Sequence, residues 1–259
     1  MITRSQIQFY RSLGEKKERE ASACFSAEGD KMVREALALS GDSRYNVRQV
    51  FATREWLGQL GDLARYRGTD FMEVTRQELD RMSFQKTPNQ VVAVIGRKPE
   101  PPLPDPSASL ILGLDQVQDP GNVGTIIRIA DWFGIGMVIG SPDSADFYSP
   151  KVVQATMGSI FRVRLYTGEP EAFIGTLPSG YPVYGTHLGG TNIYEERLSR
   201  NGLIMMGNES HGLRPGLVQQ TTHRLRIPDF SIGSQPPESL NVSVAAAIVC
   251  SEFRRRASG

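Results

Sequence analysis

The sequence predicts an α/β protein in which a small N-terminal domain precedes a larger one built on a parallel β-sheet. From residue 109 onward, short apolar segments alternate with helical ones, as in parallel sheets covered by helices on both faces. A segment at 99–108 with five prolines cannot form a helix or a central strand, which places a stiff linker between the two regions. Polar turns rich in glycine and asparagine follow three apolar segments, where open parallel sheets bind ligands.

The bulk properties exclude several classes of protein. A chain of 259 residues with 39% hydrophobic content can form one large domain or two small ones, so general disorder is excluded. No run approaches the roughly 18 apolar residues of a membrane span, and residues 1–20 lack the apolar core of a signal peptide. Cys24 and Cys250 lie far apart without metal-ligand spacing. We therefore expect a cytoplasmic protein with reduced thiols, no membrane partner and no metal.

Charge is distributed unevenly along the chain. Residues 1–98 hold 17 Lys and Arg against 13 Asp and Glu, a net charge of +4, whereas the remaining residues carry −3. A basic first domain is compatible with contacts to nucleic-acid phosphates. It is also compatible with an ordinary solvated surface, so charge alone leaves both interpretations open.

Periodicity and turn signals predict the elements of the first domain. Apolar residues at helical spacing predict a helix over 30–39. Thr75 and Glu78 form a capping box that opens a second helix. Strands are expected at 47–52, 71–74 and 90–95.

The second domain shows a more regular alternation. Val123, Ile126, Ile127 and Ala130 predict a helix after the first strand, and Pro150 begins another over 150–158. The last helix is expected over 240–254, with Ser239 as its N-cap. Strands are expected at 109–114, 137–140, 162–166, 182–186, 203–207 and 224–227.

The first polar turn, at 119–124, leads into a helix that carries Arg128. Gly124 lies one turn before Arg128 and has no side chain, which leaves the guanidinium room over the helix start near Asn122. An arginine there could orient a phosphate. A solvated arginine on an amphipathic helix, with Asn122 as a simple N-cap, remains an equally open interpretation.

The other two polar turns offer further hydrogen-bonding groups. The 207–212 turn has glycines at both ends and Glu209 as an acceptor, while His211 is interpreted as a polar loop residue. Asn241 and Ser243 lie near a helix N-terminus, which suits a polarised or anionic group. The chain has no Walker loop, zinc motif, nucleophile elbow or cysteine–histidine pair. These features favour group transfer with a bound cofactor.

The three turns together resemble a known ordered motif set. Asn122-x-Gly124-x-x-x-Arg128, then Gly207-Asn208-Glu209-x-x-Gly212, then Ile227-Pro228 followed by 239–243, are similar to the motifs of the SpoU (TrmH) RNA ribose methyltransferases of the SPOUT superfamily. The similarity spans about residues 109–255. Residues 25–29, followed by Val33, Glu35 and Ala36, resemble that family's small ribosomal-protein-like, RNA-binding accessory domain.

The resemblance implies a SPOUT methyltransferase domain over 109–259 with a deep trefoil knot, an RNA substrate-binding domain over 1–98, and a linker over 99–108. It implies a homodimer with its active site near the subunit interface, acting on RNA, with ribosomal RNA favoured over transfer RNA. Arg128 would activate the ribose 2′-hydroxyl with help from Asn122, while Glu209, Asn241 and Ser243 would shape the pocket. S-adenosylmethionine would bind near Thr186, Gly207, Asn208, Gly212, Ile227 and Leu240.

One departure from the family pattern affects the third motif. Thirteen positions separate Ile227 from Leu240, and residues 231–238 form an expanded loop; Asp229 stands where the family often has an apolar residue. The details of the cofactor loop are therefore open. Two other functions stay open as well: a catalytically silent RNA-binding protein on the same fold, and a nucleotide-binding α/β enzyme of another kind.

Overall fold

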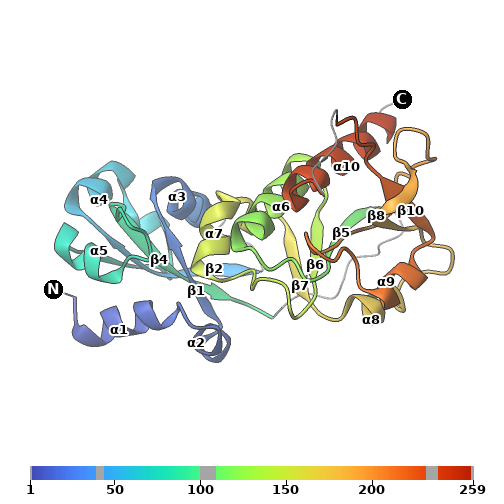
Figure 1. Cartoon of the computed structure of the whole chain (residues 1–259). Helices are drawn as coiled ribbons and strands as arrows, with labels where there is room; N and C mark the ends of the chain where they lie inside the picture. Colours follow the sequence, from blue (N-terminus) through green and yellow to red (C-terminus); the bar gives the residue numbers. More distant parts are fainter. Residues whose placement is uncertain (1, 39–43, 100–108, 232–238, 258–259) are drawn as a thin grey trace. The chain divides into compact units, whose positions relative to one another are not determined.

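The computed structural model of the chain describes residues 2–38, 44–99, 109–231 and 239–257. Nearly all of the predicted linker at 99–108 and of the expanded loop at 231–238 therefore lies outside the described residues. Two compact units share the chain: residues 1–102 together with 146–161, and residues 103–145 together with 162–259. Figure 1 shows the elements of each unit.

The first unit is built on a mixed four-stranded sheet. Its strand order is β1-β4-β2-β3, in which β4 runs antiparallel to both neighbours and β2 and β3 run parallel. The three predicted strands, the first predicted helix and the capping box of Thr75 are all present. The strands are β1 (Cys24–Glu28), β2 (Tyr45–Ala52), β3 (Asp70–Glu73) and β4 (Val91–Arg97); the helices of the N-terminal segment are α1 (Arg4–Ser12), α2 (Lys16–Ser22), α3 (Asp30–Ala38), α4 (Arg54–Leu60), the single 3-10 turn η1 (Leu63–Arg65) and α5 (Arg76–Met82).

A buried carboxylate ties the helices of this unit to its sheet. The side chain of Glu28, at the end of β1, accepts hydrogen bonds from the Tyr10 hydroxyl at 3.2 Å, the Ser83 hydroxyl at 2.5 Å and the Phe84 amide at 2.8 Å. Burial, together with the charge on Glu28, raises the pKa of Tyr10 well above its ordinary value. Apolar residues of α1 and α5 fill the layer around this group: Ile7, Tyr10, Leu13, Leu79 and Met82.

Residues 146–161 belong to the first unit although they follow the second strand of the second one. Helix α7 (Pro150–Thr156) and the 3-10 turn η3 (Ser159–Phe161) pack on the sheet through aromatic rings, with Phe161 5.8 Å from Tyr45 and Tyr148 5.1 Å from Phe25 between ring centroids. The predicted helix at 150–158 is confirmed but ends two residues earlier. The predicted domain boundaries at 1–98 and 109–259 stay a prediction. The periodicity of residues 146–161 does not indicate to which unit they belong.

The second unit is built on a six-stranded sheet in which every neighbouring pair is parallel. Its order is β10-β8-β9-β5-β6-β7, which confirms the predicted parallel α/β architecture. Strand β8 pairs with β10 at Gly185 and again at Thr191, so the residues between them bulge out of the ladder. The strands are β5 (Leu110–Leu114), β6 (Met137–Gly140), β7 (Arg164–Thr167), β8 (Val183–Asn192), β9 (Gly202–Met206) and β10 (His223–Arg226).

Helices cover both faces of this sheet (Figure 1). Helices α6 (Pro120–Trp132) and α10 (Val242–Ala257) pack together on one face, and α8 (Pro170–Ile174) and α9 (Pro215–Gln220) lie on the other. Within the described part of the chain, every helix is too short or too polar to span a bilayer. The trefoil knot stays a prediction, because strand order and pairing do not by themselves establish threading.

The aromatic packing of residues 146–161 predicts a stability effect. We expect Phe161→Ala to lower the free energy of unfolding of the first unit by about 3–5 kcal/mol, because it removes a ring that is 1% exposed. Trp56, which is buried in the same unit, reports this transition by fluorescence in a Trp132→Phe background. Phe9→Ala is the matched control, since Phe9 is 41% exposed and should cost less than about 1 kcal/mol. Equal losses of unfolding free energy in the two variants would contradict the assignment of residues 146–161 to the first unit.

Candidate active site

The three polar turns lie beyond the carboxyl ends of β5, β9 and β10. Because all strands of the sheet are parallel, these ends share one edge, which is where open α/β sheets bind ligands. The first turn starts α6, the second connects β9 to α9, and the third leads into α10. The fold therefore places at one edge three turns whose residues Asn122, Glu209 and Asn241 lie up to 119 positions apart in the sequence.

Asn122 joins the three turns through its side-chain amide. Its Nδ2 donates to Glu209 Oε1 at 2.7 Å, and its Oδ1 accepts from Asn241 Nδ2 at 3.0 Å. Asn122 is not the N-cap of α6; Asp119 is, because its carboxylate accepts from the Asn122 backbone amide at 2.8 Å. Capping by Asp119 leaves the Asn122 side chain available to link the other two turns.

The N-cap of α10 is Asn241, and the prediction of Ser239 was wrong. Asn241 Oδ1 accepts from the backbone amides of Ser243 at 2.9 Å and Val244 at 3.3 Å, and from the Ser243 hydroxyl at 2.6 Å. The helix begins at Val242, which puts Ser239 too far back to cap it. The Ser239 hydroxyl instead donates to the Glu209 carbonyl at 3.4 Å. One asparagine thus caps the helix with its oxygen and reaches Asn122 with its nitrogen.

The 207–212 turn is closed on itself. Asn208 and Gly212 exchange backbone hydrogen bonds of 3.0 and 2.9 Å, and Gly212 has a φ of +69°, which favours glycine. A Cβ on Gly207 would lie 2.3 Å from the carbonyl carbon of Gly212, so only glycine fits there. Asn208 Oδ1 accepts from the His211 backbone amide at 3.2 Å and lies 3.3 Å from its ring nitrogen. His211 is therefore held as a polar loop residue, as predicted.

Three residues that the sequence interpretation missed anchor this turn. Asp115, which is fully buried, accepts two hydrogen bonds from Arg214, and Asn208 Nδ2 donates to the Gln116 carbonyl at 2.9 Å. Gln116 has a φ of +57°, a left-handed conformation that costs about 1–2 kcal/mol outside glycine. No motif signals this group; only the buried position of Asp115 directly after a strand could have suggested it.

Arg128 stands apart from the hydrogen-bonded cluster. Its side chain is exposed on α6, and it makes no hydrogen bond or ion pair with any residue of the described segments. Gly124 and Thr125 precede it on the same helix, so no large side chain of that turn covers it. The structure thus brings together Asn122, Glu209, Asn241 and Ser243, and leaves the guanidinium available to a molecule from outside.

The residues predicted to hold the cofactor line the same edge of the sheet. Thr186 Oγ1 donates to the Met205 carbonyl at 3.1 Å, Ile227 follows β10, and Leu240 precedes α10 with 47% of its surface exposed. Backbone groups of glycine-rich turns and apolar side chains suit a purine and a sulfonium. Among residues with a described placement, no cluster of His, Cys, Asp and Glu has the geometry to hold a metal ion.

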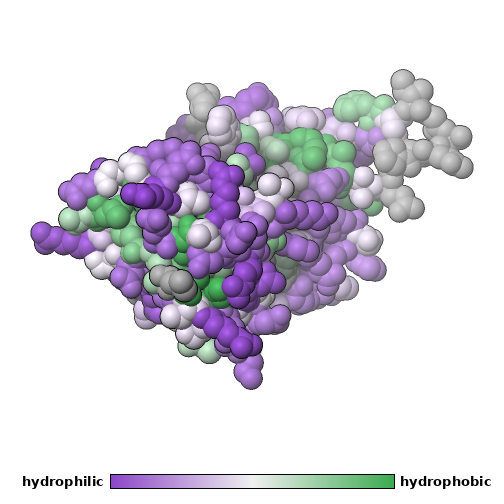
Figure 2. All heavy atoms as spheres, turned by 90° about the vertical axis from the view of Figure 1, so that its left-hand side faces the viewer, coloured by the Kyte–Doolittle hydropathy of each residue, from purple (hydrophilic) through white to green (hydrophobic). Residues whose placement is uncertain are grey.

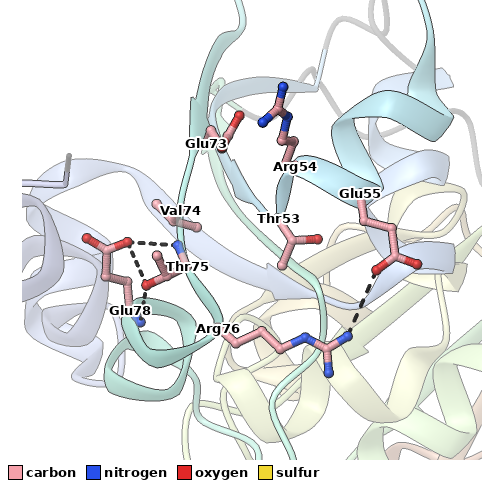
Figure 3. A pocket seen from close by; sticks show the side chains of 8 residues that line it. All are labelled: Thr53, Arg54, Glu55, Glu73, Val74, Thr75, Arg76 and Glu78. Atoms are coloured by element: carbon pink, nitrogen blue, oxygen red, sulfur yellow. Dashed lines mark hydrogen bonds and ion pairs between the residues drawn. The ribbon is translucent and has the colours of Figure 1, made fainter.

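A separate hollow of about 490 Å³ lies in the first unit, at the carboxyl ends of β2 and β3. Figure 3 shows Arg76 directed toward Glu55, but the pair is 4.0 Å apart with side chains 74% and 62% exposed, so it is weak. Figure 2 shows that the face carrying α4 and α5 is predominantly hydrophilic. Strands β2 and β3 are each followed by a threonine that is the N-cap of the next helix and then by an arginine. These pairs are Thr53–Arg54 after β2 and Thr75–Arg76 after β3.

Comparison with protein families gives two adjacent matches. Residues 109–251 match the SpoU rRNA Methylase family, and residues 4–93 match the MRM3-like substrate binding domain. The first match covers more than half of the chain and contains all three polar turns.

Known proteins and solved structures agree with this match. The 23S rRNA (guanosine(2553)-2′-O)-methyltransferase RlmP of Bacillus subtilis is 31% identical over 251 residues, which cover 96% of each chain. A protein described as an RNA methyltransferase of the TrmH family from Porphyromonas gingivalis has a TM-score of 0.86 and 39% identity, with 99% of both chains covered. The AdoMet-bound rRNA methyltransferase from Sinorhizobium meliloti has a TM-score of 0.85 and 30% identity over 99% of this chain and 96% of that one.

The family, the reaction class and the cofactor S-adenosylmethionine were predicted from the three motifs, and the α/β fold from the alternation of strands and helices; the comparisons confirm them. The turns that carry Asn122, Glu209 and Asn241 are joined by hydrogen bonds, while the roles of these residues stay a prediction. The chain belongs to the SpoU rRNA methylase family and is an S-adenosylmethionine-dependent RNA 2′-O-methyltransferase.

Proposed function

We propose that this chain methylates a ribose 2′-hydroxyl of ribosomal RNA at the edge of the parallel sheet. The observation that carries the proposal is the hydrogen-bonded set Glu209–Asn122–Asn241, with Arg128 on the same helix as Asn122 and without a hydrogen bond to any described residue. Ribosomal RNA is favoured because relatives matched over both units are named for it, among them the B. subtilis protein and the 23S rRNA (guanosine-2′-O-)-methyltransferase RlmB of Neisseria meningitidis.

Arg128 activates the sugar hydroxyl. A 2′-hydroxyl is a poor nucleophile until its proton leaves, and this proton passes to solvent water because a guanidinium is a donor only. Arg128 therefore acts by stabilising the developing alkoxide. The same side chain can also clamp the adjoining phosphate with its planar fork. S-adenosylmethionine supplies the methyl group as a sulfonium when bound. The remaining task of the protein is to align the oxygen in line with that methyl.

The hydrogen-bonded set provides this alignment. Asn122 and Glu209 fix the first two turns against each other, and Asn241 with Ser243 fixes the start of α10. S-adenosylmethionine would be held by the backbone of Gly207, Asn208 and Gly212, and by Thr186, Ile227 and Leu240. A catalytically silent RNA-binding protein could also use Arg128 to contact a phosphate, so binding of S-adenosylmethionine and methyl transfer are what separate the two functions.

The first unit supplies RNA affinity through Arg54 and Arg76, the two arginines on the rim of its hollow. A phosphate competes easily with the weak partner of Arg76, which lies 4.0 Å away. Five charged residues line the hollow, and three of them are glutamates, so the hollow as a whole does not attract anions. We therefore assign the contact with RNA phosphates to the two arginine side chains themselves.

The chain forms a homodimer through the outer face of α6 and α10. Trp132 is 85% exposed and Val244 is 49% exposed on these helices, so an interface here would remove apolar surface from water. Trp132 follows Arg128 by one helical turn, so this interface brings the partner subunit next to the catalytic arginine. Sedimentation velocity of the full chain should give the mass of a dimer.

We also place the protein in the cytoplasm, in keeping with a ribosomal RNA substrate and two unpaired cysteines.

Arg128→Ala should abolish most methyl transfer while leaving the affinity for S-adenosylmethionine within about twofold. The guanidinium acts on the hydroxyl, and Arg128 is exposed without a hydrogen bond or ion pair to the described residues, so the fold and the cofactor site should remain. Transfer of labelled methyl groups to ribosomal RNA from cells lacking the protein measures the first quantity, and calorimetry the second. Arg200→Ala, at another exposed position of the same unit, is the control. Full activity in Arg128→Ala would remove the role given to Arg128.

The double variant Arg54→Gln, Arg76→Gln should bind ribosomal RNA fragments about tenfold more weakly at physiological salt. The slope of log affinity against log salt concentration should fall by about 1–2, because two phosphate contacts are lost. Affinity for S-adenosylmethionine should not change. The control Lys16→Gln, Lys17→Gln removes the same charge elsewhere in the first unit. Identical salt slopes in the two double variants would place the RNA contact elsewhere.

A further inference from the structure

Asp115, which is buried, and Arg214, which is partly exposed, form an ion pair that no motif of the family resemblance includes. Asp115 directly follows β5 and is fully buried. Its Oδ2 accepts from the Arg214 backbone amide at 2.8 Å, and its Oδ1 accepts from Arg214 Nε at 2.6 Å. A buried carboxylate has lost its hydration and depends on such partners, so this contact is strongly constrained in geometry.

The pair fixes the far end of the 207–212 turn. Arg214 is the residue before α9, two positions beyond Gly212. The near end is fixed by Asn208, whose Nδ2 donates to the carbonyl of Gln116 at 2.9 Å. Both ends of the turn are therefore attached to two consecutive residues, Asp115 and Gln116, that leave the central strand β5.

A second carboxylate completes the arrangement. Asp143 accepts from Arg214 Nη2 at 3.1 Å and from Gln116 Nε2 at 2.8 Å. The Gln116 backbone amide donates to the Ser141 hydroxyl at 2.9 Å, which holds Gln116 in its left-handed conformation. Hydrogen bonds thus close a ring across the carboxyl ends of three adjacent strands, β6, β5 and β9.

The turn held in this way carries Glu209, which reaches Asn122 at 2.7 Å. We infer that Asp115 and Arg214 are positioning residues, which hold the 207–212 turn in the conformation that binds S-adenosylmethionine and presents Glu209 to Asn122. The inference rests on the proposed function of this turn as a cofactor site. It differs from a general stabilising role, because the pair is attached to the ends of this turn and not to the core beneath the sheet.

The test compares Arg214→Met with the native full chain. The methionine keeps most of the aliphatic length and removes the side-chain contacts to Asp115 and Asp143, together with the longer ion pairs to Glu169 at 3.6 Å and Glu171 at 4.0 Å. The backbone hydrogen bond from residue 214 to Asp115 remains possible. We expect the dissociation constant for S-adenosylmethionine, measured by calorimetry, to rise at least tenfold. Hydrogen exchange of the Asn208 and Gly212 amides in cofactor-free protein should accelerate at least tenfold. The KM for the cofactor should rise more than kcat falls, and RNA affinity should stay within threefold.

Two further variants separate positioning from loss of stability. Arg214→Lys keeps the charge but has one nitrogen where the guanidinium has several, so it should recover part of the cofactor affinity. Arg162→Met removes a salt bridge of 2.8 Å to Asp131 in the same unit and should leave cofactor affinity unchanged. Native affinity and native exchange rates in Arg214→Met would overturn the inference, as would equal losses in Arg162→Met. A native chain that binds no S-adenosylmethionine would overturn the proposed function instead. The hydrogen-exchange rates of the Asn208 and Gly212 amides would still test whether Asp115 and Arg214 hold the turn.

Discussion

Two hydrogen bonds of one side-chain amide hold the site together. Asn122 donates to Glu209 and accepts from Asn241, partners that lie 87 and 119 positions away in the sequence. Each group is partly exposed, so each bond alone stabilises the fold by only about 1 kcal/mol. Their importance lies in geometry, because together they set the distances between the three turns that the reaction needs. The parallel sheet makes this possible by bringing the ends of its strands to one edge.

The chain separates alignment from chemical activation. The groups that fix the turns are all engaged with each other, whereas Arg128 has no partner in the described part of the chain. An arginine already bound to a carboxylate would have to break that bond before it reached a substrate oxygen. Asp115 and Asp143 instead bind a different arginine, Arg214, at the ends of the neighbouring turn. Methyl transfer depends on the alignment of the hydroxyl oxygen with the methyl group. This division lets the protein hold the three turns in fixed positions while the Arg128 guanidinium remains accessible to substrate.

Much of the fold followed from the sequence, because local patterns determine strands and helices. Five of the six strands of the second unit were predicted within a few residues, and helix α6 and the three turns were also predicted; β8 was predicted over 182–186 but continues to Asn192 beyond a bulge. The errors concern choices between nearby polar groups. Ser239 and Asn241 are both good caps, and only the start of the helix at Val242 decides between them. Residues 146–161 could not be assigned to the first unit, because their packing depends on Tyr45 and Phe25, far earlier in the chain. The pairing of Asp115 with Arg214 spans 99 positions and leaves no periodic signal.

The convergence of the turns is tested most directly by a double-mutant cycle between Asn122 and Asn241. Asn241→Ser keeps an oxygen that can cap α10 and removes the nitrogen that reaches Asn122, and Asn122→Ala removes the other partner. The measured quantity is kcat/KM for methyl transfer to ribosomal RNA in the native protein, the two single variants and the double variant. If the two asparagines act as one unit, their effects will deviate from additivity by about 1 kcal/mol or more. Effects that add to within about 0.3–0.5 kcal/mol would mean that the two turns act independently, which contradicts a single composite site.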